Sequence, residues 1–368
     1  MSSNILPPVR DRACDRCLAR SWLIERLGGH LDKVGTKAVD VLALPDDELI
    51  AALAGRRQDE VQREVRRLDL ARLRRRAESA GLDLVCRCDP GYPARLRSLQ
   101  SAPAVLHVAG GLERALALLE REAVAIVGAR RASGYGLDVA RSLGRGLVAS
   151  GITVISGMAL GIDSAAHAGA LTAHGATVAV LPGGADKPYP ASRRALYNRI
   201  VASGAVISEL PASAAVRRWA PVARNRIIAA LATMTVVVEA RSRSGALLTA
   251  AWARELGRPL GAVPGRVTSE LAAGPNGLIR SGATLIEGPQ AVLDDLFGEG
   301  EVKYAGRARA PLGEELERLL TAIEAGADTL AALTRAGVGA ERALAGLSEL
   351  ELMGYVRRGP GGRYEVAP

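Results

Sequence analysis

The stretch AVAIVGARRASGYG, residues 123–136, decides the class of fold. Its apolar run at 124–127 predicts a buried strand that ends at Gly128, and a helix is expected to begin near Gly134. α/β folds build anion sites in this way, because glycine lets the backbone approach a ligand and the free N–H groups of a helix start favour negative charge. Arg130 stands where the dinucleotide fingerprint GxGxxG has its second glycine. We therefore expect a phosphate held by a side chain as well as by the backbone.

The same construction recurs along the chain. The expected strands are residues 105–108, 124–127, 153–155, 177–181, 206–207, 235–238 and 260–263, with helical segments between most of them. Unbroken Val, Ile and Ala runs are typical of strands buried on both faces, so we predict an α/β fold with a doubly wound, mostly parallel, Rossmann-like sheet. Right-handed crossovers bring the carboxyl ends of parallel strands to one edge, and the glycine-rich turns should converge there.

The flanking segments differ from this pattern. We expect a helical N-terminal domain at 1–84, of the SAM or helix-hairpin-helix kind, before the Rossmann-like domain at 85–298. A charged, non-periodic linker at 299–311 leads to a winged-helix-like domain at 312–368, with three short helices and a hairpin that turns at 359–362. The third of these helices carries Glu341, Glu349 and Glu351 against one arginine, Arg342, and would repel DNA. Protein contact is the favoured role for this domain.

The overall charge suits a polyanionic partner. The 368 residues carry a formal net charge of +9, although an arginine-rich proteome would give the same excess. Aromatic residues make up only 3% of the chain, so a nucleic-acid site cannot depend on many stacked rings. No apolar run approaches the length of a membrane span, and the chain opens on the polar stretch MSSNILPPVRDRACDR. We expect a cytoplasmic protein.

Four cysteines form two close pairs, Cys14 with Cys17 and Cys86 with Cys88. A reducing compartment disfavours disulfides, and four thiolates in two pairs match a structural zinc site. The one-residue gap of the second pair is tighter than the usual two, which leaves small buried side chains as the alternative.

The turns at the sheet edge supply many hydrogen-bond donors and few bases. The candidates for phosphate contact are Arg130, Arg131, Ser133, Ser156, Gly157, Gly183, Gly184, Arg224, Arg226, Ser244 and Gly245. Glu209 and Glu239 are interpreted as partners that hold the arginines, with general acid roles as the alternative. Asp163 is interpreted as a helix N-cap and His167 as a packed side chain, rather than as an acid/base or metal pair. We expect this site to hold phosphate without transforming it and predict no catalytic residue.

Several motifs resemble, in order, those of the DNA-processing protein A family, DprA or Smf. They are VGAR at 127–130, SGMAxGIDxxAH at 156–167, YP at 189–190, ISE at 207–209, RNRIIA at 224–229, VEA at 238–240, SGAL at 244–247 and VPG at 263–265. The resemblance covers about residues 92–297, and many members of the family carry similar flanking domains. Carried over by position, the family's phosphate-binding Gly-x-Arg falls on Gly128 and Arg130, and its Arg-Asn-Arg motif falls on Arg224, Asn225 and Arg226.

This resemblance implies a dimeric protein that binds single-stranded DNA during natural transformation or homologous recombination. It implies that the protein protects incoming DNA and helps to load the RecA recombinase, with no required cofactor and no known catalysis. The chain departs from the family at Leu160, where many members have a basic residue, so one DNA contact is either missing or supplied by Arg131. It also has Ala220 before Pro221 where Phe is frequent, and Trp219 would then be the stacking ring.

One alternative from another class is a nucleotide-processing enzyme. Residues 182–184, Pro-Gly-Gly, resemble part of the Pro-Gly-Gly-x-Gly-Thr loop of the phosphoribohydrolase, or lysine-decarboxylase-like, family. Here Ala185 and Asp186 break that motif, and release of free base from a nucleoside monophosphate would be its test.

Overall fold

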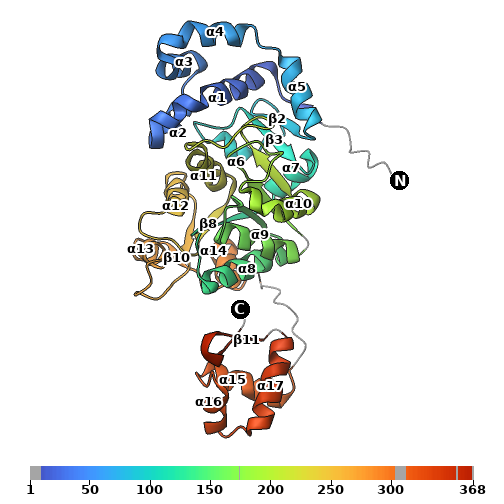
Figure 1. Ribbon diagram of the computed structural model, residues 1–368, viewed down its shortest axis with the longest axis vertical. Helices are drawn as coiled ribbons and strands as arrows, with labels where there is room; N and C mark the ends of the chain where they lie inside the picture. The colour runs from blue at the N-terminus through green and yellow to red at the C-terminus, as the bar shows by residue number, and fades with distance from the viewer. Residues whose placement is uncertain (1–9, 174, 303–311, 354, 367–368) are drawn as a thin grey trace, which may run out of the picture. The chain divides into compact units, whose positions relative to one another are not determined.

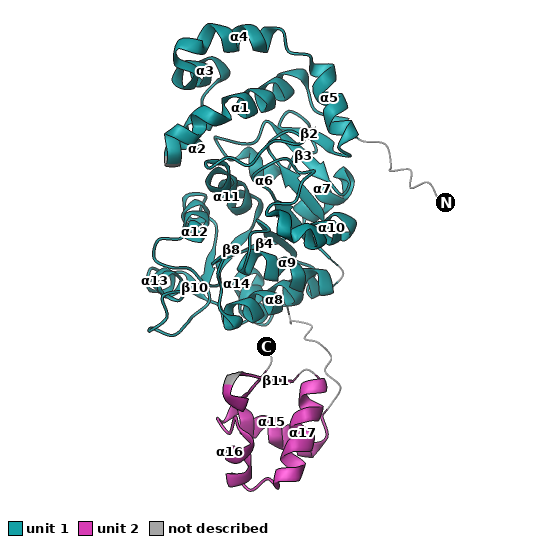
Figure 2. Ribbon diagram, viewed as in Figure 1, with its two compact units in different colours: residues 1–304 teal, residues 305–368 magenta. Residues whose placement is uncertain are grey.

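The computed structural model describes residues 10–173, 175–302, 312–353 and 355–366. The chain divides into two compact units, residues 1–304 and 305–368, each with its own hydrophobic core (Figure 2). Within the described ranges, no helix is both long enough and apolar enough to cross a lipid bilayer. Most of the linker expected at 299–311 lies outside the described residues.

A ten-stranded sheet runs through the first unit (Figure 1). Its strands are β1 (Asp11–Arg12), β2 (Asp83–Cys86), β3 (Val105–Ala109), β4 (Ala123–Val127), β5 (Thr153–Ser156), β6 (Thr177–Val180), β7 (Ala205–Ser208), β8 (Met234–Val237), β9 (Leu260–Ala262) and β10 (Thr284–Leu285). Their order across the sheet is β1-β2-β3-β7-β6-β5-β4-β8-β9-β10. Among these pairs, β3 is antiparallel to β2 and to β7, and the others are parallel. The expected mostly parallel sheet is confirmed.

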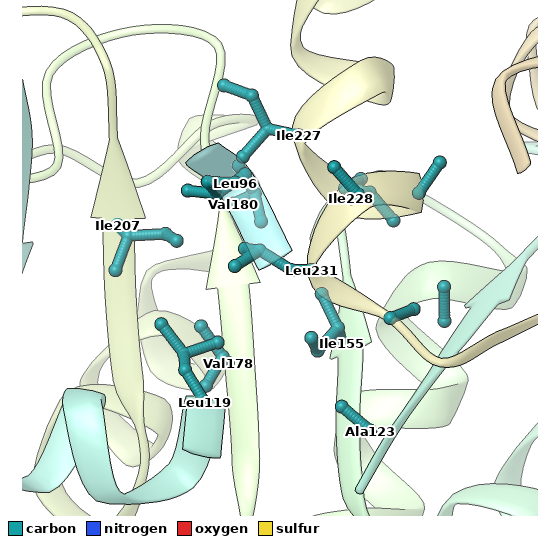
Figure 3. Packing of buried hydrophobic residues seen from close by; sticks show 14 of the residues in the cluster. Leu96, Leu119, Ala123, Ile155, Val178, Val180, Ile207, Ile227, Ile228 and Leu231 are labelled. Atoms are coloured by element: carbon teal, nitrogen blue, oxygen red, sulfur yellow. The ribbon is translucent and has the colours of Figure 1, made fainter. Parts of the chain in front are cut away.

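Helices cover both faces of the sheet, as a doubly wound fold requires. One core contains residues of α8 (Gly134–Ala149), α9 (Ile162–Thr172) and α14 (Pro289–Phe297). The other contains residues of α6 (Ala94–Arg97), α7 (Leu112–Glu120), α11 (Ala220–Leu231) and α12 (Gly245–Glu255). Strand β4 shows why the apolar run has no polar positions: Val124 and Ile126 join the first core, and Ala125 and Val127 join the second. Figure 3 shows three apolar side chains of α11 packed over β5, β6 and β7.

The N-terminal helices belong to the same compact unit as the sheet. They are α1 (Asp15–Val34), α2 (Ala38–Leu42), α3 (Asp46–Ala54), α4 (Gln58–Arg66) and α5 (Leu70–Ser79), all inserted between β1 and β2. Leu27 and Leu31 of α1 share a buried cluster with Leu210 and Trp219 of the sheet region. The boundary expected at residue 84 therefore falls inside strand β2, which is not among the strands expected from the sequence.

The remaining helices of the first unit are α10 (Arg194–Ser203) and α13 (Ala273–Arg280). The second unit contains α15 (Glu314–Glu324), α16 (Leu330–Arg335) and α17 (Ala340–Leu352), then the antiparallel pair β11 (Val356–Arg358) and β12 (Tyr364–Val366). Three helices and a hairpin match the expected winged-helix arrangement. Its core is formed by side chains such as Leu319, Leu333 and Leu347.

Candidate nucleic-acid interface

The carboxyl ends of β4, β5, β6 and β8 lie at one edge of the sheet, because these strands are parallel neighbours. A cavity of about 200 Å³ opens at this edge. Its lining includes six of the candidate phosphate ligands: Gly128, Arg130, Arg224, Asn225, Ser244 and Gly245. The structure thus brings together residues that the sequence places more than 100 positions apart, and we call this the edge cavity.

The helix start of the opening stretch is already occupied by the protein's own carboxylate. Glu239, which follows β8, accepts hydrogen bonds from the Ser133 N–H at 2.9 Å and from the Ser133 hydroxyl at 2.5 Å. The backbone carbonyl of Glu239 also accepts the N–H of Ala129 at 2.6 Å. Because this carboxylate fills the N-terminus of α8, the expected phosphate contact at Ser133 is wrong for the conformation described. Glu239 orders the arginine-bearing turn instead of holding an arginine.

A second carboxylate fills the turn after β5. Asp163 is buried and accepts the N–H groups of Gly157 at 3.1 Å and Ala159 at 3.4 Å. The residue preceding α9 is Gly161, so Asp163 binds this loop and is not the helix N-cap that we expected. Ser156 is fully buried and donates its hydroxyl to the Ile126 carbonyl at 2.6 Å, which removes it from the phosphate ligands.

Arg224 of α11 lies in the floor of the edge cavity. Its Nη1 donates to the Gly157 carbonyl at 2.8 Å and to the Val180 carbonyl. These two hydrogen bonds connect the carboxyl ends of β5 and β6 through one guanidinium group. Burial lowers the pKa of Arg224 to about 10, and nearby Asp163 partly offsets this shift. Burial raises the pKa of Asp163, against the effect of Arg224. Arg224 stays protonated at neutral pH and puts a fixed positive charge beneath the cavity.

Arg226, two residues further along α11, does not reach this cavity. Its guanidinium forms a two-point ion pair with Glu209, with nitrogen–oxygen distances of 2.9 and 2.6 Å. Its Nε donates to the Ser101 hydroxyl at 2.9 Å, and the side chain is 1% exposed. Phosphate contact by Arg226 was therefore a wrong prediction, whereas the pairing of Glu209 with an arginine is confirmed.

Two further expectations fail because the segment 211–216 covers the sheet edge near β6. A Cβ at Gly183 would meet Val216 at 2.8 Å, and Gly184 donates its N–H to the Ala214 carbonyl at 3.0 Å. Both glycines are buried, so their turn offers no open backbone to a phosphate.

Trp219 is only 3% exposed and packs against the N-terminal helices, so it is not a stacking ring.

His167 is confirmed as a packed side chain. It is completely buried, its Nδ1 lies 2.7 Å from the Thr177 hydroxyl, and burial lowers its pKa to about 3. The neutral imidazole belongs to the core between α9 and β6.

The start of α12 is the part of the edge cavity where backbone donors stay open. Ser244 caps this helix by accepting the Ala246 N–H at 3.3 Å, and Gly245 is exposed. Asn225 donates to the Gly245 carbonyl at 3.1 Å and fixes the turn against α11. An anion at this point would meet a helix N-terminus beside Arg130 and Arg224.

A larger groove of about 560 Å³ shares Arg130 with the edge cavity. Five arginines line it: Arg130, Arg131, Arg141, Arg193 and Arg199. No carboxylate is among its described lining residues, although Arg141 forms an ion pair with Asp138 at 2.7 Å, and Leu160 also lines the groove. We call this the arginine groove. Sequence reasoning missed Arg141, Arg193 and Arg199, because they come from helices α8 and α10 and the turn before α10, and not from the glycine-rich turns; the basic run at 193–199 was the available signal.

Comparison with known proteins agrees with this architecture. Residues 83–297 match the family model described as DNA recombination-mediator protein A, and residues 304–362 match the DprA winged helix domain. The chain belongs to the DNA-processing protein A family. A DNA processing protein DprA of Mycobacterium tuberculosis is 45% identical over 212 residues, which are 58% of this chain and 54% of that relative. The chain therefore spans about half the length of that DprA.

Two solved DprA structures resemble this chain in fold. The DprA of Streptococcus pneumoniae aligns with a TM-score of 0.63 and 30% identity, and the match covers 78% of this chain and 97% of that one. The DprA of Helicobacter pylori aligns with a TM-score of 0.51 and 28% identity, over 56% of this chain and 92% of that one. The structure of the latter was reported for its single-stranded DNA binding mode.

Proposed function

We propose that this chain binds single-stranded DNA along the arginine groove, with Arg130 as the contact between the groove and the edge cavity. The observation that carries the proposal is the unpaired positive charge at this place. Arg130 and Arg131 are exposed and form no hydrogen bond or ion pair to the described part of the chain. Phosphate oxygens are the partners that such guanidinium groups select.

The composition of both cavities indicates how the strand is held. No aromatic ring is among the described residues that line them. Binding then depends on the phosphate backbone and on counterion release, with little discrimination between base sequences. The single-stranded DNA binding of the Helicobacter pylori relative supports this choice of ligand.

We further propose that the protein protects incoming single strands and loads the RecA recombinase as a cytoplasmic homodimer. Membership of the DprA family supports this role, which concerns transformation and homologous recombination. Non-catalytic action fits the edge chemistry, because Glu209, Glu239 and Asp163 each accept hydrogen bonds from the chain itself.

The direct test is a fluorescence titration of a short single strand and of its duplex. We expect the wild type to bind the single strand more tightly, and Arg130→Ala to weaken that binding about tenfold at low salt, because one charged contact is lost. Arg56→Ala removes the same charge from an exposed position in the N-terminal helical segment and should leave the affinity unchanged. Equal affinities for wild type and Arg130→Ala at matched salt would contradict the proposal.

A further inference from the structure

The four cysteines meet at the base of the N-terminal helical insertion. The sulfur atoms of Cys14, Cys17, Cys86 and Cys88 all lie within 4.8 Å of one another, although the two pairs are about 70 residues apart in sequence. The Sγ atoms of Cys17 and Cys88 are 3.7 Å apart, which is far longer than a disulfide bond of about 2.05 Å. All four side chains are free thiols.

This spacing matches a single tetrahedral ion. Four zinc–sulfur bonds of about 2.3 Å at tetrahedral angles put the sulfur atoms about 3.8 Å apart. A polynuclear cluster places several metal and sulfide atoms between its cysteines, so sulfurs gathered this closely suit one ion. Four soft thiolates without a carboxylate or imidazole favour zinc among the common divalent ions.

The backbone holds the two cysteine pairs in place independently of any ion. Strand β1 pairs in parallel with β2, with Arg12 opposite Val85, so the residues that follow each strand emerge side by side. Cys14 then precedes α1, Cys17 lies in its first turn, and Cys86 ends β2. The sequence therefore brings the ligands together through secondary structure and not through a flexible loop.

Donors that suit thiolate sulfurs surround the cluster. The Cys14 N–H donates to the sulfur of Cys86 at 3.3 Å, and the Arg16 guanidinium donates to the sulfur of Cys88 at 3.8 Å. Outer contacts of this kind orient metal ligands and reduce the excess negative charge of four thiolates around a divalent ion. Cys17 and Cys86 are buried, and Cys14 and Cys88 are exposed, which leaves a path for the ion to enter.

We propose that these four cysteines bind one structural zinc ion that fastens the start of α1 to the end of β2. The ion closes a loop that contains all five N-terminal helices, and closure of so long a loop restricts the unfolded chain. Binding replaces the protons of the coordinating thiols, which pass to solvent, and involves no electron transfer. The proposal is independent of DNA binding.

The first test is the metal content of full-length protein purified under reducing conditions without added zinc. We expect about one zinc per chain, retained on gel filtration and released when a mercurial reagent modifies the thiols. Replacement with cobalt should give the absorbance of thiolate-bound tetrahedral Co²⁺. A metal content near zero overturns the proposal, and so does iron in place of zinc.

Variants at one ligand separate coordination from simple packing. Cys88→Ser should lose zinc on dialysis and lower the first melting transition by about 5 °C or more, whereas Cys88→His supplies a permitted ligand and should keep the metal. Arg56→Ala changes an exposed residue of the N-terminal helical segment that is not part of the cysteine cluster, and this control variant should keep the metal. A full zinc content in Cys88→Ser would overturn the assignment. If the serine variant does not fold, the metal contents of the wild type and of Cys88→His decide the question instead.

Discussion

The two arginines of one short motif have different tasks because of helix geometry. Residues two positions apart on an α-helix point in nearly opposite directions, so Arg224 and Arg226 cannot face the same ligand. Arg224 turns toward the edge cavity, and Arg226 turns toward Glu209 and Ser101 in the interior. The two-residue spacing of Arg224 and Arg226 in a helix already predicts that they face different sides. The expectation that both contact phosphate did not take this spacing into account.

We expect the ion pair between Arg226 and Glu209 to stabilise the folded protein rather than to bind DNA. Arg226→Ala leaves the buried carboxylate of Glu209 without its partner, so we expect the free energy of unfolding to fall by about 3–5 kcal/mol. Urea denaturation measures this loss, and Arg130→Ala, at an exposed position, should stay within about 0.5 kcal/mol of wild type. An Arg226→Ala protein with wild-type stability and lost DNA affinity would reverse the two roles.

The buried histidine predicts a dependence of stability on pH. The pKa of His167 is about 3 in the folded state and about 6.5 in the unfolded chain, so below pH 6.5 the unfolded state binds a proton that the folded state does not. This contribution is complete above pH 6.5 and is lost as the pH falls. Between pH 7.5 and 5.5, wild type should lose about 1.4 kcal/mol more unfolding free energy than His167→Gln.

The comparison with His167→Gln is needed because other groups also titrate. His107 is buried with a pKa of about 3 and acts in the same direction, whereas the raised pKa of Asp163 acts in the opposite one. Both are present in the two proteins and cancel in the difference. Parallel stability profiles for wild type and variant would show that His167 is not the neutral, buried group described.

At the scale of elements, the turns at the sheet edge are ordered by the protein's own carboxylates. Glu239 satisfies the start of α8, and Asp163 satisfies the turn after β5. These carboxylates occupy backbone donors of the turns, so an external anion has to be bound by the exposed arginines. The close approach of Arg224 to the turn after β5 depends on Gly157, where a Cβ would overlap the guanidinium.

Gly157→Ala should therefore displace Arg224 from the floor of the edge cavity. We expect a loss of about 1–3 kcal/mol in unfolding free energy from overpacking, together with weaker binding of single-stranded DNA. Gly134→Ala is the matched control, because a Cβ there meets open space at the start of α8. If the two alanine variants behave alike in stability and in DNA titration, Gly157 does not position Arg224.

The sequence predicted the parallel elements well, because each strand is an unbroken apolar run that ends in a glycine-rich turn. Strand β2 was missed, because it has only four residues and the stretch RCDPGYP that follows it resembles a connector, and because its pairing with β3 is antiparallel. The convergence of Arg130, Arg224 and Ser244 at one edge followed from topology. The topology did not predict which hydrogen-bond donors at this edge stay free. The groups that occupy or cover them, Glu239, Asp163 and the segment 211–216, come from other parts of the chain.

At the scale of the whole molecule, part of the positive charge behind the net charge of +9 is concentrated in one groove. The arginine groove gathers positive charge without a lining carboxylate, at the edge to which the parallel strands deliver their turns. The winged-helix unit has its own core and carries Glu341, Glu349 and Glu351 on α17. These features support the proposal that the first unit is the part of the chain that binds a polyanion.

The most direct test of this account is the salt dependence of single-stranded DNA binding. Each phosphate contact contributes about 0.7 to the slope of log affinity against log salt concentration, so replacing both Arg130 and Arg131 with alanine should reduce the slope by about 1.4. The matched double variant at Arg56 and Arg57, which are exposed in the N-terminal helical segment, should keep the wild-type slope. An unchanged slope in the groove variant, or an equal reduction in both variants, would contradict binding along the arginine groove.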